Sequence, residues 1–157
     1  MNIFATSKCP VESAGYLDDK RVIKMVSESA QMLCHVVGFY GHESYGLPVS
    51  QWNHPVVKWL DEDISNQSWL YRHFIALLDQ FALRRGKLHD AEKLRNILHP
   101  FFNAHGSSEP SSFKNCAANE SKGVSFKHEK DVHLAYRLYL NERWKTDKIQ
   151  PKWFGNN

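Results

Sequence analysis

The sequence has few cysteines and no long apolar run, and both shortages restrict the class of protein that it can encode. Its 157 residues include three cysteines, Cys9, Cys34 and Cys116. An odd number at wide spacing fits neither a disulfide framework nor a CxxC metal or redox site, so we expect a reducing compartment. No stretch approaches the roughly 18 consecutive apolar residues of a membrane span. The opening MNIFATSKCP lacks the basic region and the apolar run of a secretory signal. We therefore expect a cytoplasmic protein with no membrane partner.

Motifs for common cofactors and metals are also missing. The sequence contains neither GxxxxGK[ST] nor GxGxxG, which excludes these two kinds of phosphate-binding loop. It has nine histidines but no HExxH motif, and its closest pair, His128 and His133, is five residues apart. This spacing does not place two ligands on one helix face. We expect no metal and no cofactor.

What the sequence does have is the composition of an ordinary globular domain. Apolar residues make up 42 % of it and charged residues 24 %, and the 20 Lys and Arg exceed the 17 Asp and Glu to give a net charge of +3. A chain of this length can bury a core of its own without disulfides or metals. A single domain over residues 1–157 follows.

Apolar residues recur at helical spacings of three and four along most of the chain. Val22, Val26, Ala30 and Leu33 form one such stripe, and Trp69, Phe74, Leu77 and Phe81 form another. The first predicted helix starts at Pro10, the second covers residues 18–37, and the third covers residues 54–63 after an Asn53 cap. The fourth runs from a cap at Ser65 or Asn66 to Arg85 and ends before Gly86. The fifth runs from Asp90 to a stop at Pro100, and the last runs from Val132 to Trp144. No alternating strand pattern is found. The prediction is an all-α, single compact domain of five or six helices.

Three segments depart from this pattern. Residues 38–52 form an aromatic, glycine-containing loop that we expect to fold over the core. Residues 100–128 are rich in Ser, Asn and Gly, which predicts a long polar surface loop or flexible insert. Residues 150–157 form a C-terminal tail, because Pro151 prevents the last helix from continuing.

Basic residues gather in three places. Lys20 and Lys24 lie one helical turn apart and could face a phosphate, or they could belong to a solvated face neutralised by Asp18, Asp19 and Glu28. The second cluster, Arg84, Arg85, Lys87 and His89, follows a helix C-terminus, where the helix dipole alone favours cations. In the third, basic residues of the tail region alternate with Trp144, Trp153 and Phe154. That mixture suits single-stranded or distorted nucleic acid, but the rings could equally clamp the tail to the core.

Polar, directional side chains are dense around residue 54. Asn53, His54 and Asn66 could form a functional hydrogen-bond network, or the two asparagines could simply cap helices.

These segments, taken in order, resemble a family of small phage-encoded proteins. The similarity lies in residues 18–25 and 28–33, in Asn53-His54-Pro55, in Trp69-Leu70, and in Arg85-Gly86-Lys87 with His89. More distantly, the order of parts resembles the pyrimidine-dimer DNA glycosylases of the endonuclease V type. Those are small basic all-α proteins with a histidine before a long central helix that ends in Arg-Gly, and with a Pro-x-Trp-aromatic tail. The matching positions here are His54, Arg85-Gly86 and residues 151–154.

The glycosylase resemblance implies a specific chemistry. The N-terminal amine, exposed by loss of the initiator methionine, would attack the deoxyribose C1′ at a damaged pyrimidine and form a Schiff base, supported by a carboxylate. In that family the exposed residue is small, whereas this chain begins Met1-Asn2. By position, the candidate catalytic residues are Asp18, Asp19 and His54.

Two functions are compatible with these features. The first is a small phage-type, nucleic-acid-directed protein of glycosylase-like helical fold, in which Lys20, Lys24, His54 and the cluster Arg84, Arg85 and Lys87 form one phosphate-binding groove. The second is a non-catalytic phage protein that binds a nucleotide or a host enzyme through residues 39–52 and 100–128. The candidate nucleic-acid or phosphate-binding residues are Lys20, Lys24, Asn53, Asn66, Arg84, Arg85, Lys87, His89 and Trp153.

Overall fold

The computed structural model describes residues 2–38, 45–102 and 109–153. Within these ranges the chain forms six α-helices and a two-stranded sheet, which confirms the all-α prediction. The helices are α1 (Pro10–Tyr16), α2 (Asp19–Val36), α3 (Pro55–Glu62), α4 (Ile64–Arg85), α5 (Leu94–Phe102) and α6 (Val132–Thr146). The strands are β1 (Ala118–Asn119) and β2 (Val124–Ser125), and short 3-10 helices cover Val49–Gln51, Asp90–Lys93 and Glu120–Lys122.

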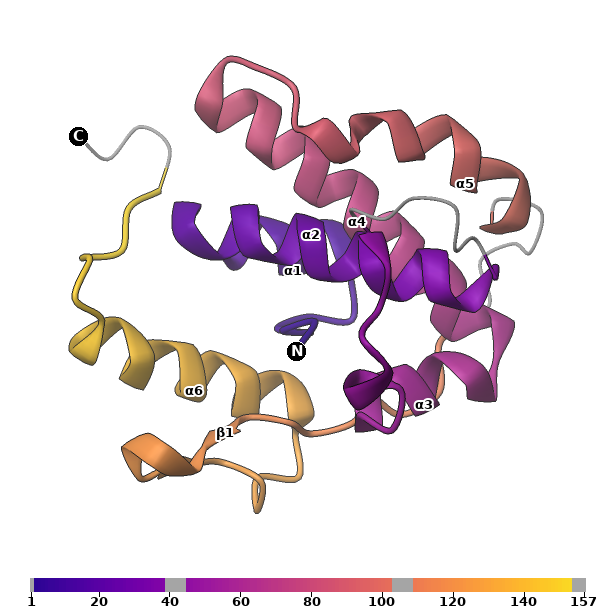
Figure 1. The fold of residues 1–157 in the computed structure, drawn as a ribbon. Helices are drawn as coiled ribbons and strands as arrows, with labels where there is room; N and C mark the ends of the chain where they lie inside the picture. The colour runs from indigo at the N-terminus through magenta and orange to yellow at the C-terminus, as the bar shows by residue number, and fades with distance from the viewer. Residues whose placement is uncertain (1, 39–44, 103–108, 154–157) are drawn as a thin grey trace.

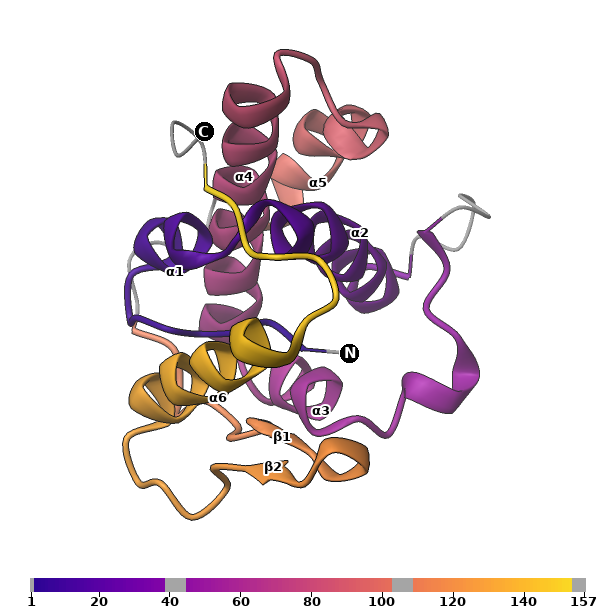
Figure 2. The ribbon, with the colours of Figure 1, turned by 90° about the vertical axis from the view of Figure 1, so that its left-hand side faces the viewer.

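Helix α4 is the centre of the fold. It packs against α1, α2, α3 and α5, and Figure 1 shows α2 crossing in front of it with α5 above. Helix α6 and the β1–β2 hairpin form a second layer below (Figure 2). The extended N-terminal segment, residues 2–9, passes between the two layers. Residues 3–6 are therefore buried inside the molecule, near α2, α3 and α6.

Side chains from both layers hold this extended segment by its carbonyl oxygens. From α6, His133 Nδ1 lies 2.7 Å from the oxygen of Ala5, and Arg137 donates to that of Thr6 at 2.6 Å. From α4, Trp69 donates to the oxygen of Lys8 at 2.7 Å. A buried segment without a regular partner strand needs such donors, because unpaired backbone carbonyls are costly to bury.

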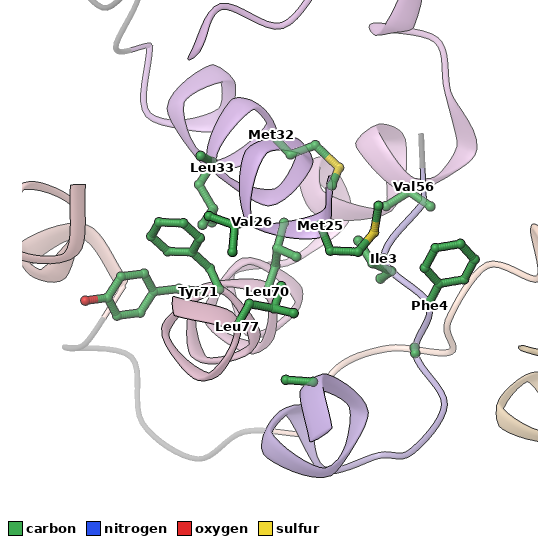
Figure 3. Close-up of a cluster of buried hydrophobic side chains, with 14 of the residues drawn as sticks. Ile3, Phe4, Met25, Val26, Met32, Leu33, Val56, Leu70, Tyr71 and Leu77 are labelled. Atoms are coloured by element: carbon green, nitrogen blue, oxygen red, sulfur yellow. The ribbon is translucent and has the colours of Figure 1, made fainter. Parts of the chain in front are cut away.

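The apolar stripes predicted from the sequence form the core. Val22, Val26, Ala30 and Leu33 are all buried on α2. Figure 3 shows Val26 and Leu33 pointing toward Leu70 and Leu77 of α4, with Ile3 and Phe4 of the N-terminal segment beside Met25 and Val56. The N-terminal segment is thus anchored by apolar burial as well as by hydrogen bonds.

Two helix starts differ from the prediction. Helix α3 is capped by His54, whose Nδ1 accepts the Val56 N–H at 3.2 Å, so the predicted Asn53 cap is wrong. Helix α4 is capped by Asp63, which accepts the Ser65 N–H at 2.7 Å, rather than by Ser65 or Asn66. An unprotonated ring nitrogen can accept a cap hydrogen bond as an asparagine oxygen does. The C-terminal end of α4 is as predicted, with Gly86 at φ 65°.

Helix α5 also corrects the sequence prediction. Asp90 opens a short 3-10 turn capped by His89, and α5 then continues through Pro100 to Phe102. Leu94, Leu98 and Phe102 are buried at intervals of four residues. Proline near the helix end removes one hydrogen bond, and the burial of Phe102 one turn beyond Leu98 compensates for that loss.

The polar segment after α5 contains structure that the sequence did not suggest. Its two strands are two residues long and too short to give an alternating pattern. The ring of Phe113 lies 5.0 Å from that of Trp59 and 4.8 Å from that of Trp69, and Ala117 is fully buried. The predicted mobility of residues 100–128 stays a prediction, and residues 39–44, 103–108 and Phe154 lie outside the described residues.

No helix in the described part of the chain combines the length and the hydropathy needed to cross a membrane.

Candidate active site at the N-terminal segment

A basic cavity of about 590 Å³ opens beside the buried start of the chain. It is enclosed by residues from the N-terminal segment, α2, the start of α3, the hairpin region and α6. Its charged lining consists of Lys20, Arg21, Lys24, Glu120, Lys127 and Arg143. Five of these six side chains are cations, so the cavity suits an anionic ligand.

Asn2, which lines this cavity, contacts Glu28 of α2, which is not itself among the lining residues. The backbone nitrogen of Asn2 donates to Glu28 Oε2 at 3.0 Å, although the two residues are 26 positions apart. The other oxygen of Glu28, Oε1, lies 3.3 Å from Lys24 Nζ. The Glu28 side chain is only 15 % exposed. A carboxylate therefore contacts the nitrogen of residue 2 in a largely enclosed setting.

Helix α2 positions the cations on one side of the cavity. Arg21 is buried and donates to Asp18 and to Asp147, each at 2.8 Å. Lys20 is half exposed, with its Nζ 4.0 Å from Asp147. Burial acts to raise the pKa of Asp147, but the hydrogen bond and charge of Arg21 hold that pKa below its usual value. Arg21 is thus committed to a structural ion-pair network, whereas Lys20 projects to solvent.

Helix α6 supplies Arg143 from the other side. This arginine donates to the Tyr139 hydroxyl at 3.0 Å and lies 3.4 Å from Asp147. Its Nε is buried and has no hydrogen-bond partner among the described residues. Arg143 therefore contributes positive charge to the cavity, while its Nε stays enclosed within the fold.

His54 lies at the same cavity with a fixed tautomer. Its Nδ1 accepts the cap hydrogen bond from Val56, so the proton of the neutral ring is on Nε2. Burial lowers the pKa of His54, while Glu28 acts in the opposite direction. A neutral ring with its N–H on Nε2 is a hydrogen-bond donor at physiological pH.

The structure places the predicted site residues in several locations. Lys20, Lys24 and His54 line one cavity together. Arg85, Lys87 and His89 line a separate, smaller cavity of about 330 Å³. Arg84 is almost fully buried and binds the Leu17 carbonyl oxygen at 2.7 Å and Asp19 at 3.1 Å, which ties α4 to the start of α2.

The remaining candidates have contacts that stabilise the fold. Asp18 is buried, accepting hydrogen bonds from Arg21 and from the Trp144 indole. Asn66 is buried and bonds to the Trp59 carbonyl oxygen and to Ser111. Trp153 packs its ring 4.9 Å from that of Trp144, and its indole N–H donates to the Tyr16 carbonyl oxygen. Asn53, by contrast, is exposed. Among the described residues that line the cavity, none is Asp18, Asp19 or Glu28.

The sequence reasoning did not single out Asn2 or Glu28 as site residues. Glu28 follows Lys24 by one helical turn, and that spacing is the only local signal for it. Its contact with Asn2 depends on the N-terminal segment entering the molecule, which no local pattern reveals.

No group of three or more His, Cys, Asp and Glu side chains that could hold a metal ion occurs in the described ranges.

Comparison with known proteins gives one match. The family model for pyrimidine dimer DNA glycosylase matches residues 1–94 of this chain. No curated protein and no solved structure matches it. The matched region contains Asn2, Lys24, Glu28 and His54, and ends before the hairpin and α6.

Proposed function

The chain belongs to the pyrimidine dimer DNA glycosylase family, and we propose on this premise that it removes damaged pyrimidines from DNA and cleaves the resulting abasic site. The observation that carries the proposal is the contact of the Asn2 nitrogen with the Glu28 carboxylate, because Asn2 itself lines a cation-rich cavity. The basic lining supports a DNA substrate, because phosphate contacts dominate the affinity of DNA-binding proteins.

The Asn2 nitrogen is the proposed nucleophile. Removal of Met1 converts this nitrogen from a peptide N–H into an α-amine, whose ordinary pKa of about 7.7–8.0 leaves a useful neutral fraction at physiological pH. Glu28 Oε2, at 3.0 Å, is placed to accept a proton from the ammonium form. Of the carboxylates at the start of α2, Asp18 and Asp19 are engaged with Arg21 and Arg84, so Glu28 is the better candidate for this role.

The proposed reaction can be written as a series of balanced steps. The amine attacks C1′, the bond from C1′ to the pyrimidine nitrogen breaks, and the electron pair stays on the pyrimidine, which takes a proton. The C1′–O4′ bond then breaks, its electron pair stays on the ring oxygen, which takes the proton that the nitrogen loses, and an imine forms between the nitrogen and C1′. Loss of a proton from C2′ then expels the 3′ phosphate, and water releases the amine. His54 Nε2–H and the Lys24 ammonium are the donors available to the sugar and phosphate oxygens.

Trapping with borohydride tests this mechanism. The full chain lacking only Met1, verified by intact mass, is incubated with ultraviolet-irradiated duplex DNA and borohydride, which reduces the imine to a stable amine. We expect a covalent protein–DNA adduct with irradiated duplex and with abasic duplex, and none with undamaged duplex.

Two controls define what would contradict the proposal. If the chain that retains Met1 traps equally well, the Asn2 nitrogen is not the nucleophile. If the processed chain at micromolar concentration gives neither adduct nor nicking, the catalytic function is wrong, and a non-catalytic role in binding a nucleotide or another protein is left.

A further inference from the structure

The Asn2 side chain is engaged on all its polar atoms, unlike the flexible first residue expected of most chains. Its Oδ1 accepts hydrogen bonds from the backbone N–H groups of Ile3 at 2.8 Å and Phe4 at 3.0 Å. Its Nδ2 donates to the Cys116 carbonyl oxygen at 3.3 Å, in the segment just before β1. These partners fix the orientation of the amide, since two N–H groups require an oxygen and a carbonyl requires an N–H.

The backbone next to Asn2 is held in an unusual conformation. Phe4 has a φ of 45°, and it is the only non-glycine residue with positive φ in the described ranges. The left-handed region is unfavourable for a residue with a Cβ, so surrounding contacts must maintain it. The Asn2 Oδ1 bond to the Phe4 N–H is one such contact. The others are ring contacts of Phe4 with Tyr136 and Tyr139, both at 6.1 Å.

This bend directs the Asn2 nitrogen toward Glu28. Phe4, at the bend, and Ile3, just before it, are buried, and Asn2 and Phe4 both line the cavity. Side chain and backbone of Asn2 thus connect three parts of the fold: the buried segment, the hairpin region at Cys116, and α2 at Glu28.

We propose that the Asn2 side chain is a positioning residue that holds the reactive nitrogen of its own residue against Glu28. This inference rests on the proposed function. A nucleophile at a chain end would otherwise sample many orientations, and fixing a reacting group in its productive geometry contributes strongly to rate. The amide acts through its own backbone and does not need to touch the substrate.

Variants at residue 2 test this role by separating rate from binding. Asn2→Ala removes all the side-chain hydrogen bonds, and Asn2→Asp keeps the Oδ1 acceptor but loses the donor to Cys116. Each chain is released from a fusion so that residue 2 is its first residue. Measurements are made at pH 9, above the ordinary α-amino pKa of about 8. Asn141→Ala, on the exposed face of α6, is the matched control.

The readouts are the single-turnover rate of borohydride trapping on abasic duplex at saturating protein, and the Kd for the same DNA. We expect Asn2→Ala to lower the rate at least about tenfold with Kd within about twofold, and Asn2→Asp to recover part of the rate. Asn141→Ala should match the wild type. Should Asn2→Ala fail to fold, Asn2→Ser, whose hydroxyl can still accept from the Phe4 N–H, takes its place with a smaller expected loss.

A rate for Asn2→Ala equal to that of the wild type would overturn the inference, as would a loss confined to Kd. A wild-type chain that does not trap at all would instead refute the proposed function, and this result is obtained before any variant is compared.

Discussion

At the scale of single residues, the role of Glu28 is the most direct prediction. Glu28→Gln keeps the shape and an oxygen acceptor but removes the carboxylate that contacts the Asn2 nitrogen at 3.0 Å. General acid–base groups typically contribute 10²–10⁴-fold, so we expect trapping on damaged duplex to slow by at least about 100-fold. The measurement is the single-turnover trapping rate of the processed chain.

A matched control separates this effect from the loss of a surface ion pair. Glu142 pairs with Lys145 at 2.6 Å on α6, away from the cavity, as Glu28 pairs with Lys24 on α2. Glu142→Gln should trap at the wild-type rate. If both variants lose the same activity, Glu28 has no special place in the reaction.

Lys20 is expected to contact a DNA phosphate. It is half exposed at the cavity, and its Nζ is 4.0 Å from Asp147, which leaves it available to a ligand. Lys20→Ala should weaken DNA binding and reduce the slope of log K against log salt by about 0.9, the value for one lost phosphate contact. Titrations over a range of salt concentrations measure this slope. Lys145→Ala is the control, and an unchanged slope for Lys20→Ala would remove Lys20 from the interface.

At the scale of secondary-structure elements, the C-terminal end of α4 gives a stability prediction. Gly86 has a φ of 65°, and an added Cβ would meet nothing within 4 Å. Gly86→Ala therefore costs only backbone strain, and we expect the free energy of unfolding to fall by about 1 kcal/mol. Gly15, inside α1, has equal space and no positive φ. Gly15→Ala should stabilise the protein by about 0.5–1 kcal/mol, since alanine favours helix.

Chemical denaturation of the two variants checks the opposite signs. For a chain of this size about 1 kcal/mol corresponds to roughly 2–4 °C in Tm. If Gly86→Ala and Gly15→Ala change the free energy of unfolding by the same amount and in the same direction, the positive φ of Gly86 does not determine the stability change.

The elements also show what could be predicted from the sequence and what could not. The helices follow from apolar spacing, because residues such as Val22 and Val26 are buried where the period places them. Caps were less predictable, since His54 and Asp63 replace the expected asparagine and serine. Pro100 was expected to end a helix, but the burial of Phe102 outweighs one lost hydrogen bond. The spacing of apolar residues along the sequence predicts which segments are helical, and tertiary packing determines where each helix begins and ends.

The same distinction applies to the candidate site. Helical spacing brought Lys20 and Lys24 together, and the structure adds His54 to them in one cavity. The pairing of Asn2 with Glu28 spans 26 residues and depends on a non-helical segment held by side chains from α4 and α6. Such long-range contacts leave no periodic trace in the sequence.

At the scale of the whole molecule, the cavity depends on parts of the chain that lie far apart in the sequence. The family match covers residues 1–94, which include the Asn2 nitrogen, Glu28 and His54. The opposite wall comes from the hairpin region and α6, with Lys127 and Arg143. The N-terminal segment lies between these two layers (Figure 2). Any condition that separates the layers should therefore disrupt the cavity as well as the fold.

Acid is expected to destabilise the fold, because of His73 in the core. This ring is fully buried on α4, stacks 5.0 Å from Trp69, and its Nδ1 donates to the Pro10 carbonyl oxygen at 2.9 Å. Its Nε2 is buried and has no hydrogen-bond partner among the described residues. Burial lowers the pKa of His73 to about 4, although its backbone hydrogen bond acts in the opposite direction. Protonation of this ring is therefore disfavoured in the folded protein, where it links α4 to the first residue of α1.

The sign of the pH effect follows from this shift. Between the ordinary pKa of 6.5 and about 4, the unfolded chain binds a proton at His73 and the folded chain does not. Stability should therefore be complete above pH 6.5 and fall as the pH drops toward 4, by about 3 kcal/mol from this group. Urea unfolding at pH 7 and at pH 4.5 measures the loss, to which burial of His54 and His89 adds in the same direction.

Substitution isolates the contribution of His73. His73→Phe keeps a ring against Trp69 but cannot be protonated, so we expect a less stable protein at pH 7, where the Pro10 carbonyl oxygen loses its donor. That variant should also lose clearly less stability than the wild type between pH 7 and pH 4.5. His128→Ala, at an exposed position, should keep the full wild-type loss. If His73→Phe and the wild type lose equal stability, groups other than His73 cause the acid sensitivity.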